Sequence, residues 1–327
     1  MMKNPVTGAL ENFNFDQLLE YVPEIKGFNL NIYSIAFEPP IDSSDISPES
    51  WSELVRIIYS NYERYDGFVI LHGTDTMAYS ASTLSFMLEG LTKPVIFTGS
   101  QLPIGTPRTD GKENLISSVE IAAAKDDEGH ALVPEVCICF DNVLIRGNRS
   151  RKFNSDNFRA FRSEDHPPLA EAGISIRYLP YNPPISDTAP HFSLCKLKNV
   201  PIGVLKIFPG ISFPIFDTLM TEKLKGIVLE TFGAGNIPGE GHTLLPIIKR
   251  AFNAGSVVTV CSQCPQGTVT LGAYKTSSPL VSAGAVSGYD MTTEAAVAKL
   301  YYLFSKDFSK EEIKEKMEEN LRGELTK

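Results

Sequence analysis

A short apolar run leads directly into a polar turn in Gly67-Phe68-Val69-Ile70-Leu71-His72-Gly73-Thr74-Asp75-Thr76-Met77. The continuous run before the turn is typical of a parallel strand that is covered on both faces. After the turn, apolar residues recur at helical spacing, namely Met77, Ala81, Leu84 and Leu88. The turn therefore lies at the carboxyl end of a strand, where ligands bind in open α/β sheets because free N–H groups point into the crevice.

Thr74 and Asp75 have two interpretations. They could simply cap the helix, which is the usual role of Thr or Asp at a strand-to-helix junction. Gly73 favours a ligand site, because a residue without a side chain lets the backbone approach a ligand closely. Both interpretations stay open at this point.

The alternation of short apolar runs with helical periods continues along the chain and predicts right-handed crossovers and a mainly parallel sheet. The predicted strands of this first part span residues 28–35, 67–71, 95–98 and 135–140, with an extension at 143–146. The predicted helices span a short segment around 15–22, one that starts after Ser47 with Pro48 in its first turn, one that reaches Leu88, and 110–124.

Residues 178–198 are polar, contain four prolines and show no periodicity, so they indicate a linker between domains. Beyond it we expect strands at 203–208, 226–230 and 257–261 and helices at 216–224, 244–254, 292–304 and 310–320. The predicted fold class is thus α/β with a larger N-terminal domain at 1–180, a linker at 181–199 and a smaller C-terminal α/β domain at 200–327.

Composition narrows the class of partner. The 327 residues are 43% hydrophobic, and their net charge of −9 argues against nucleic acid or an anionic membrane surface. A small neutral or zwitterionic substrate is compatible with this charge. No segment approaches the roughly 18 apolar residues of a membrane span, and the first residues lack a signal peptide's apolar core. We therefore expect a cytoplasmic protein.

The cysteines indicate reduced thiols, because their number, five, is odd in a long chain. Cys261 and Cys264 have the C-x-x-C spacing, but no second pair or nearby His accompanies them. A buried strand end is therefore favoured over a zinc site.

Gly233-Ala234-Gly235 could cradle a phosphate. However, the next glycine is one residue too late for the dinucleotide-binding motif, and Pro238 interrupts the helix start, so a nucleotide-binding site is disfavoured.

The candidate chemistry depends on an activated nucleophile, since amide hydrolysis also needs a base and donors for the oxyanion. No Gly-x-Ser-x-Gly motif occurs. His72 precedes the polar turn, where a hydrogen-bonded structural imidazole is the favoured role. A lysine is the alternative base, since it can exchange a proton where arginine cannot.

Several motifs resemble the L-asparaginase/glutaminase family, most of all its type I, cytosolic branch. They are His72-Gly73-Thr74-Asp75-Thr76-Met77, Thr98-Gly99-Ser100-Gln101, Arg146-Gly147-Asn148-Arg149 followed by Lys152, Gly288-Tyr289-Asp290-Met291-Thr292, and the ending Asn320-Leu321-Arg322-Gly323-Glu324-Leu325. The similarity extends over essentially the whole chain.

The resemblance implies an amidohydrolase that converts L-asparagine, with L-glutamine as the alternative substrate, into L-aspartate and ammonia. It implies an acyl-enzyme on threonine and neither a metal nor an organic cofactor. The implied catalytic residues are Thr74, Asp75, Lys152 and Tyr289. The implied substrate contacts are Ser43, Ser44, Thr74, Asp75, Ser100 and Asn236. Backbone N–H groups near Gly73 and Thr74 would serve the oxyanion.

The resemblance also implies a homodimer, or a dimer of dimers, in which Asn236 reaches the site of a neighbouring subunit. Some type I relatives carry an allosteric asparagine site. Glu230 places an acidic residue where the allosteric relative has a basic one, so we expect cooperativity to be weak or absent.

The sequence departs from the family at its start. Family members begin with an apolar strand that runs into Gly-Gly-Thr-Ile-Gly, whose Thr is the first nucleophile, and no Gly-Gly-Thr occurs here. We expect the natural protein to be longer and these residues alone to be nearly inactive and poorly stable. The alternative is a truncated or non-catalytic protein that binds asparagine without turnover. Full activity would instead give the nucleophile's role to Thr74.

Overall fold

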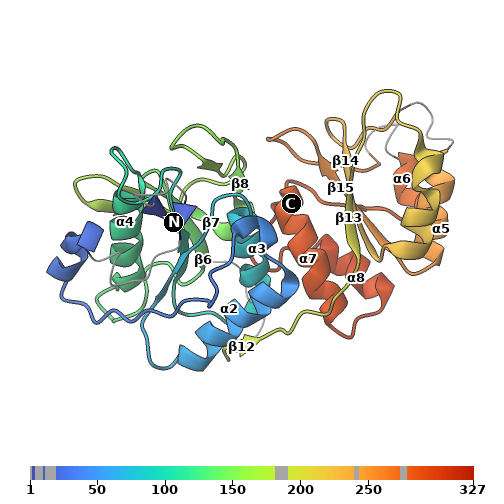
Figure 1. Cartoon of the computed structure of the whole chain (residues 1–327). Coiled ribbons are helices and arrows are strands. Elements are labelled where there is room, and N and C mark those ends of the chain that lie inside the picture. Colours follow the sequence, from blue (N-terminus) through green and yellow to red (C-terminus); the bar gives the residue numbers. More distant parts are fainter. Residues whose placement is uncertain (1, 4–9, 12–19, 181–190, 239–242, 273–277) are drawn as a thin grey trace. The chain divides into compact units, whose positions relative to one another are not determined.

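The structure is a computed structural model that describes residues 2–3, 10–11, 20–180, 191–238, 243–272 and 278–327. The chain divides into two compact units, Met1–Asn182 with Pro190–Leu194 and Pro183–Ala189 with Cys195–Lys327 (Figure 1). Both units are α/β, which confirms the predicted fold class. Part of the predicted linker, residues 181–190, lies outside the described residues.

The first unit contains a six-stranded sheet in the order β11-β10-β7-β6-β5-β3. Its strands are β3 (Phe68–Leu71), β5 (Val95–Thr98), β6 (Val136–Phe140), β7 (Val143–Arg146), β10 (Ala170–Ala172) and β11 (Ile176–Tyr178). The pairs β3–β5 and β5–β6 are parallel, and the pairs beyond β6 are antiparallel. Asp141 and Asn142 reverse the chain between β6 and β7 with φ of 48° and 62°, values that short polar side chains tolerate in a tight hairpin turn.

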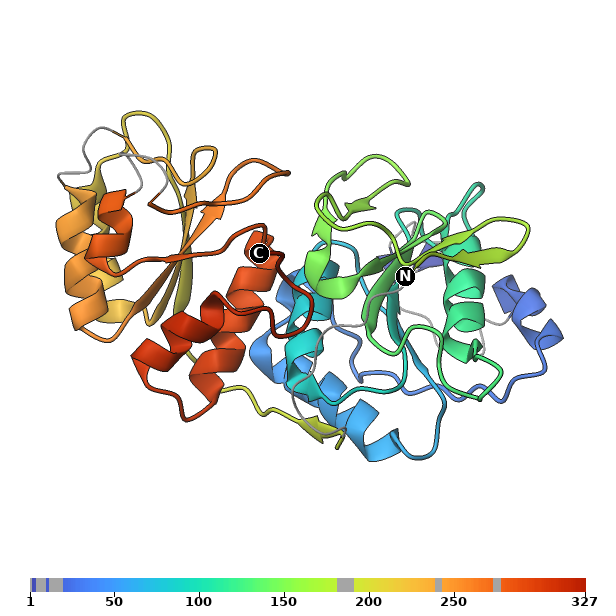
Figure 2. The same cartoon turned by 180° about the vertical axis from the view of Figure 1, so that it is seen from behind.

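Helices cover both faces of this sheet. Helix α4 (Gly111–Ala123) lies on one face, and α2 (Pro48–Asn61) and α3 (Met77–Met87) lie on the other, as two opposite views show (Figures 1 and 2). The start of α2 follows the prediction: Ser47 caps it reciprocally with Ser50, and Pro48 occupies the first turn. Almost every residue of α3 is buried, because this helix packs between α2 and the sheet.

Short elements complete the first unit. They are β1 (Met2–Lys3), β2 (Leu10–Glu11), β4 (Leu88–Glu89), β8 (Arg151–Lys152), β9 (Phe161–Arg162), β12 (Ser193–Leu194) and the 3-10 turns η1 (Pro23–Gly27), η2 (Ser43–Asp45) and η3 (Gly147–Arg149). Strand β12 pairs with β4 in a separate two-stranded sheet, so part of the predicted linker forms a short strand outside the six-stranded sheet.

Two other predictions also differ from the structure. Residues 28–35 form no strand, because no backbone among the described residues pairs with them and most of their side chains are exposed. The helix predicted around 15–22 falls largely on residues 12–19, which lie outside the described residues, while Pro23 opens the turn η1 directly after Val22.

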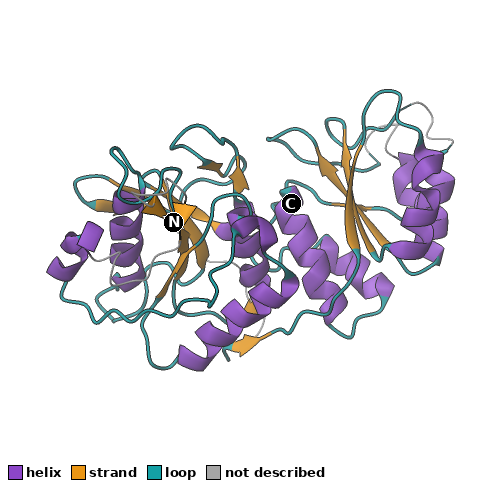
Figure 3. Ribbon diagram, viewed as in Figure 1, coloured by secondary structure: helices purple, strands orange, loops and turns teal. Residues whose placement is uncertain are grey.

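The second unit has a four-stranded sheet in which all pairs are parallel. Its strands are β13 (Ile202–Lys206), β14 (Gly226–Thr231), β15 (Val257–Ser262) and β16 (Val286–Ser287). Helices α5 (Leu244–Asn253) and α6 (Ser278–Ala283) cover one face, and α7 (Thr293–Ser305) and α8 (Lys310–Met317) cover the other (Figure 3). The helix predicted at 216–224 is instead a 3-10 turn, η4 (Phe213–Phe216), followed by one π turn, η5 (Leu219–Lys223).

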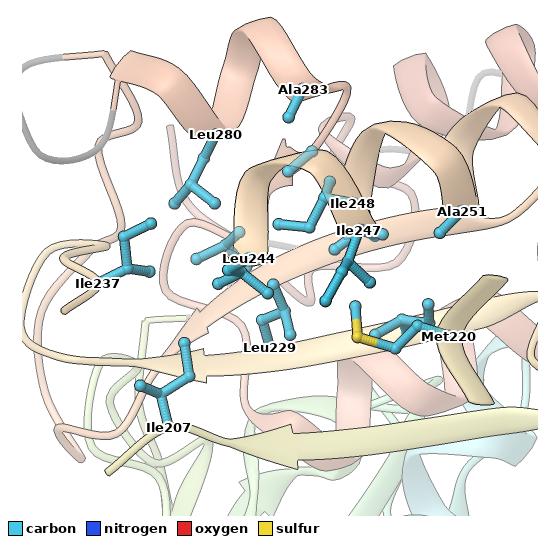
Figure 4. Close-up of a cluster of buried hydrophobic side chains, with 14 of the residues drawn as sticks. Ile207, Met220, Leu229, Ile237, Leu244, Ile247, Ile248, Ala251, Leu280 and Ala283 are labelled. Carbon is cyan, nitrogen blue, oxygen red and sulfur yellow. The ribbon is translucent and has the colours of Figure 1, made fainter. Parts of the chain in front are cut away.

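Apolar packing between the sheet and α5–α6 forms the core of this unit. Leu244, Ile247 and Ile248 point from α5 toward Leu229 of β14 (Figure 4). On the other face the Lys299 ammonium lies 2.6 Å from the Glu324 carboxylate, and both side chains are fully buried. This ion pair fixes the segment after α8 to α7.

Candidate active site

The polar turn after β3 does not cap α3 with the expected side chains. The N-cap of this helix is Thr76, and its side chain makes no capping hydrogen bond. The side chains of Thr74 and Asp75 contact Lys152 instead. The helix-capping interpretation of these two residues is therefore wrong, and the structure favours the ligand-site interpretation.

Lys152 joins the two residues of the turn. Its Nζ donates a hydrogen bond to Thr74 Oγ1 at 2.9 Å and lies 2.5 Å from Asp75 Oδ1. The Lys152 side chain is 19% exposed and that of Asp75 is 68% exposed, so the group opens to solvent on the carboxylate side. Lys152 belongs to β8, which pairs with β9 as a short hairpin beside α3 (Figure 1). A hydroxyl, an amine and a carboxylate in contact can exchange a proton along the group.

Gln101 is part of this arrangement, although the sequence interpretation assigned it no role. Thr74 Oγ1 donates to Gln101 Oε1 at 3.2 Å. The amide nitrogen of Gln101 donates to the backbone carbonyls of Asn157 at 3.0 Å and Asn154 at 3.4 Å. Gln101 thus ties the turn to the loop that follows Lys152. The available signal was its place in the Thr-Gly-Ser-Gln motif.

The loop that carries Ser43 and Ser44 packs against the same turn. Ser43 is buried, and a Cβ added to Gly73 would lie only 2.4 Å from Ser43 Oγ. Thr76 Oγ1 donates to the Ser43 carbonyl at 2.6 Å. Ser44 is exposed and donates through its amide and its hydroxyl to the Asp42 carboxylate, which lowers the pKa of Asp42. The structure therefore brings Ser43 to the turn and directs the Ser44 hydroxyl to Asp42.

Ser100 lies on a third loop at the same edge of the sheet. Leu71 of β3 is in register with Thr98 of β5, so the loops after both strands leave side by side. Their contact is close, since a Cβ on Gly99 would lie 2.3 Å from the His72 carbonyl oxygen. The loop that carries Ser100 therefore contacts the polar turn that carries Thr74 and Asp75.

Asn236 and Tyr289 belong to the second unit, separate from the unit that holds Thr74 and Lys152. Asn236 closes a tight turn after β14 through two backbone hydrogen bonds with Phe232. Tyr289 has a left-handed φ of 50°, which costs free energy for a non-glycine residue. Partial burial raises the pKa of its phenol.

The remaining ionisable candidates have structural surroundings. His72 is hydrogen-bonded on both ring nitrogens, so the predicted hydrogen bonding of this imidazole is confirmed. All five cysteines are free thiols, and Cys261 is buried at the end of β15 as predicted, while Cys264 is exposed. Within the described part of the chain, no group of three or more His, Cys, Asp or Glu residues is placed to hold a metal ion. No helix in the described ranges is long and apolar enough to cross a membrane.

Comparison with known proteins agrees with the motifs and the site. Residues 1–183 match the family "Asparaginase, N-terminal", and residues 201–317 match "Glutaminase/Asparaginase C-terminal domain". The chain therefore belongs to the asparaginase family, and the predicted resemblance is confirmed.

Within the family, the chain is similar to type I enzymes. It is 43% identical to "L-asparaginase 1" of Escherichia coli, over 98% of this chain and 92% of that protein. The solved structure of L-asparaginase I from Vibrio cholerae has 41% identity and a TM-score of 0.86, covering 100% of this chain and 98% of the other. The thermostable L-asparaginase of Thermococcus kodakarensis has 31% identity and a TM-score of 0.88, with 99% and 95% covered.

Proposed function

We propose that this protein is an L-asparaginase, which hydrolyses the side-chain amide of L-asparagine to L-aspartate and ammonia through an acyl-enzyme on threonine. The observation that carries the proposal is the contact of Lys152 Nζ with both Thr74 Oγ1 and Asp75 Oδ1. The similarity to proteins named L-asparaginase over nearly the full chain supports the substrate.

The proposed first half-reaction forms the acyl-enzyme on Thr74, which takes the nucleophile's role here because the sequence contains no Gly-Gly-Thr. The Lys152 ammonium first releases one proton to solvent, and the resulting amine accepts the proton of the Thr74 hydroxyl while Oγ1 bonds to the side-chain carbonyl carbon of asparagine. The carbonyl oxygen becomes an oxyanion, which backbone N–H groups of the turn stabilise. When the C–N bond breaks, the Lys152 ammonium returns the proton to the leaving nitrogen, and ammonia departs. Asp75 stabilises the ammonium and holds it against Thr74.

The second half-reaction releases L-aspartate. Lys152 accepts a proton from a water molecule, and the water oxygen bonds to the ester carbon. The bond from this carbon to Thr74 Oγ1 then breaks, and the proton on Lys152 passes to Oγ1. The hydroxyl is restored, so one water is consumed for each amide hydrolysed.

The substrate contacts proposed from the family are Ser43, Ser44 and Ser100 in the first unit and Asn236 in the second. Tyr289 is proposed as an auxiliary catalytic residue. We also propose a cytoplasmic homodimer or dimer of dimers, since Asn236 is then supplied by a neighbouring subunit. L-Glutamine remains the alternative substrate, because one methylene in a pocket changes the free energy of the transition state by only about 1–3 kcal/mol.

The test is ammonia release from L-asparagine, run beside calorimetric binding of the same amino acid. Turnover with a β-aspartyl adduct on a Thr74 peptide, trapped by acid quench and mass spectrometry, supports the proposal. Binding without ammonia release supports the alternative, a non-catalytic protein that holds asparagine. Turnover with the adduct on another residue removes Thr74 as nucleophile.

A further inference from the structure

A chain of hydrogen bonds runs from the core of the first unit to the catalytic turn. Trp51 Nε1 of α2 lies 2.8 Å from Ser80 Oγ of α3, and Ser80 Oγ lies 2.9 Å from His72 Nε2. The other ring nitrogen, His72 Nδ1, lies 2.6 Å from the carbonyl oxygen of Gly73. Ser80 is fully buried and Trp51 is 7% exposed, so these groups exchange no partners with solvent.

For a neutral imidazole, the chemistry at the two ends fixes every proton in this chain. An indole N–H can only donate, and a carbonyl oxygen can only accept. Ser80 therefore accepts from Trp51 and has its one hydrogen left for His72 Nε2. Since Nε2 accepts, the imidazole carries its hydrogen on Nδ1 and donates it to the Gly73 carbonyl. Burial lowers the pKa of His72, in agreement with a neutral ring.

The last bond in the chain orients a peptide group of the proposed active site. The carbonyl of Gly73 and the N–H of Thr74 belong to one planar trans peptide and point in opposite directions. With the carbonyl held toward the His72 ring, the Thr74 N–H must point away from that ring. Among the hydrogen bonds between described residues, none uses this N–H. The His72 ring itself is held edge-on against Phe97, with centroids 5.7 Å apart.

We propose that His72, aligned by Trp51 and Ser80, is a positioning residue that aims the Thr74 N–H at the oxyanion of the acyl-transfer transition state. The inference rests on the proposed amide hydrolysis, because it assigns the Thr74 N–H a role in that reaction. His72 itself exchanges no proton with substrate. A preorganised donor of this kind stabilises charge that exists only in the transition state, so its effect belongs to kcat rather than to KM.

Two substitutions of His72 separate positioning from simple filling of space. His72→Asn places an amide N–H near the position of Nδ1 and keeps a donor for the Gly73 carbonyl. His72→Gln extends the amide toward Ser80 and leaves that carbonyl without its donor. We expect His72→Asn to retain kcat within about threefold and His72→Gln to lose about 10- to 100-fold in kcat at unchanged KM, less than the 10²–10³-fold loss on deleting a donor outright.

Ser80→Ala interrupts the chain one bond earlier and is matched by Ser118→Ala. Ser118 is also a fully buried helical serine, but its hydroxyl bonds to Asn114 O within its own helix α4. Both variants should lose a similar, small amount of stability, and only Ser80→Ala should lower kcat, by about threefold to tenfold, because the imidazole can then turn or change tautomer.

The Thr74 amide resonance in ¹H–¹⁵N spectra gives a readout that needs no turnover. It should move in His72→Gln and stay close to its wild-type position in His72→Asn. Equal kcat values for the two His72 variants, or equal Thr74 shifts, would overturn the positioning role. Absence of ammonia release by the wild-type protein would count against the proposed function, and the amide comparison would still decide whether His72 orients the turn.

Discussion

Replacing Lys152 by Met removes the ammonium that contacts both Thr74 and Asp75 while keeping most of the side-chain volume. The expected cost in folding free energy is small. Asp75 is 68% exposed, and ion pairs open to solvent contribute at most about 1 kcal/mol. The expected cost in catalysis is larger, since a positioned acid or base contributes about 10²–10⁴-fold in rate. That range corresponds to about 3–5 kcal/mol in the activation barrier.

The assay compares kcat for ammonia release with the urea midpoint of the same preparation. Lys125→Met is a matched control, because Lys125 Nζ lies 2.8 Å from Asp66 Oδ1 in a second, more exposed Lys–Asp pair of the first unit. Both variants should keep wild-type stability within about 1 kcal/mol, and only Lys152→Met should lose turnover. Lys152→Met with kcat within threefold of wild type, or a loss of turnover that merely tracks unfolding, would refute the lysine mechanism.

Three further predictions concern the rest of the chain. Lys299→Met should lower the free energy of unfolding by about 3–5 kcal/mol, because it leaves the fully buried Glu324 carboxylate unpaired; a urea midpoint equal to wild type would contradict this. Because burial lowers the pKa of His72, the folded state binds a proton on this ring less readily than the unfolded state does. The free energy of unfolding should therefore be unaffected by His72 above about pH 6.5 and should fall below that pH by up to about 1.4 kcal/mol per pH unit. Urea titrations should show a shallower fall for His72→Asn. Cys264 is exposed, whereas the other four cysteines are buried and burial raises the pKa of Cys139 to about 11. A thiol reagent at pH 8 should therefore label one cysteine in the native protein and five in urea, and two or more native labels would be inconsistent with this burial.

Much of the architecture could be predicted because burial leaves a periodic signal in the sequence. The run at 67–71 does form a strand, but the expectation that both of its faces are covered is wrong: β3 is the edge strand among the described strands of its sheet, its residues are only partly buried, and Leu71 is 50% exposed. The apolar period from Met77 reflects a helix that packs between α2 and the sheet. The strand predicted at 28–35 shows the limit of such patterns. Alternation predicts a strand only if another backbone pairs with it, and within the described residues none does.

The site was predictable as a turn but not as a set of contacts. The lack of a side chain at Gly73 predicts room for a ligand to approach, whereas Ser43 occupies the space beside it. Gln101 was missed because its partners Asn154 and Asn157 are more than fifty positions away, a separation that no local pattern records. Lys152 was found only because the family motif places a lysine there.

Gln101 and His72 each hold the turn that carries Thr74 by a hydrogen bond, and the free energy needed to break each bond determines its role in the reaction. Both hydrogens of the Gln101 amide are used by backbone carbonyls, so Oε1 must accept the hydroxyl hydrogen of Thr74. That hydrogen has to leave Gln101 before Lys152 can take it, at a cost of about 0.5–1.5 kcal/mol for one hydrogen bond. This cost is well below the 3–5 kcal/mol expected from Lys152, so Gln101 can fix the resting orientation of Thr74 without preventing transfer. On the opposite side His72 holds the Gly73 carbonyl, a bond that need not break at any step, which is why we assign it to orientation throughout the reaction.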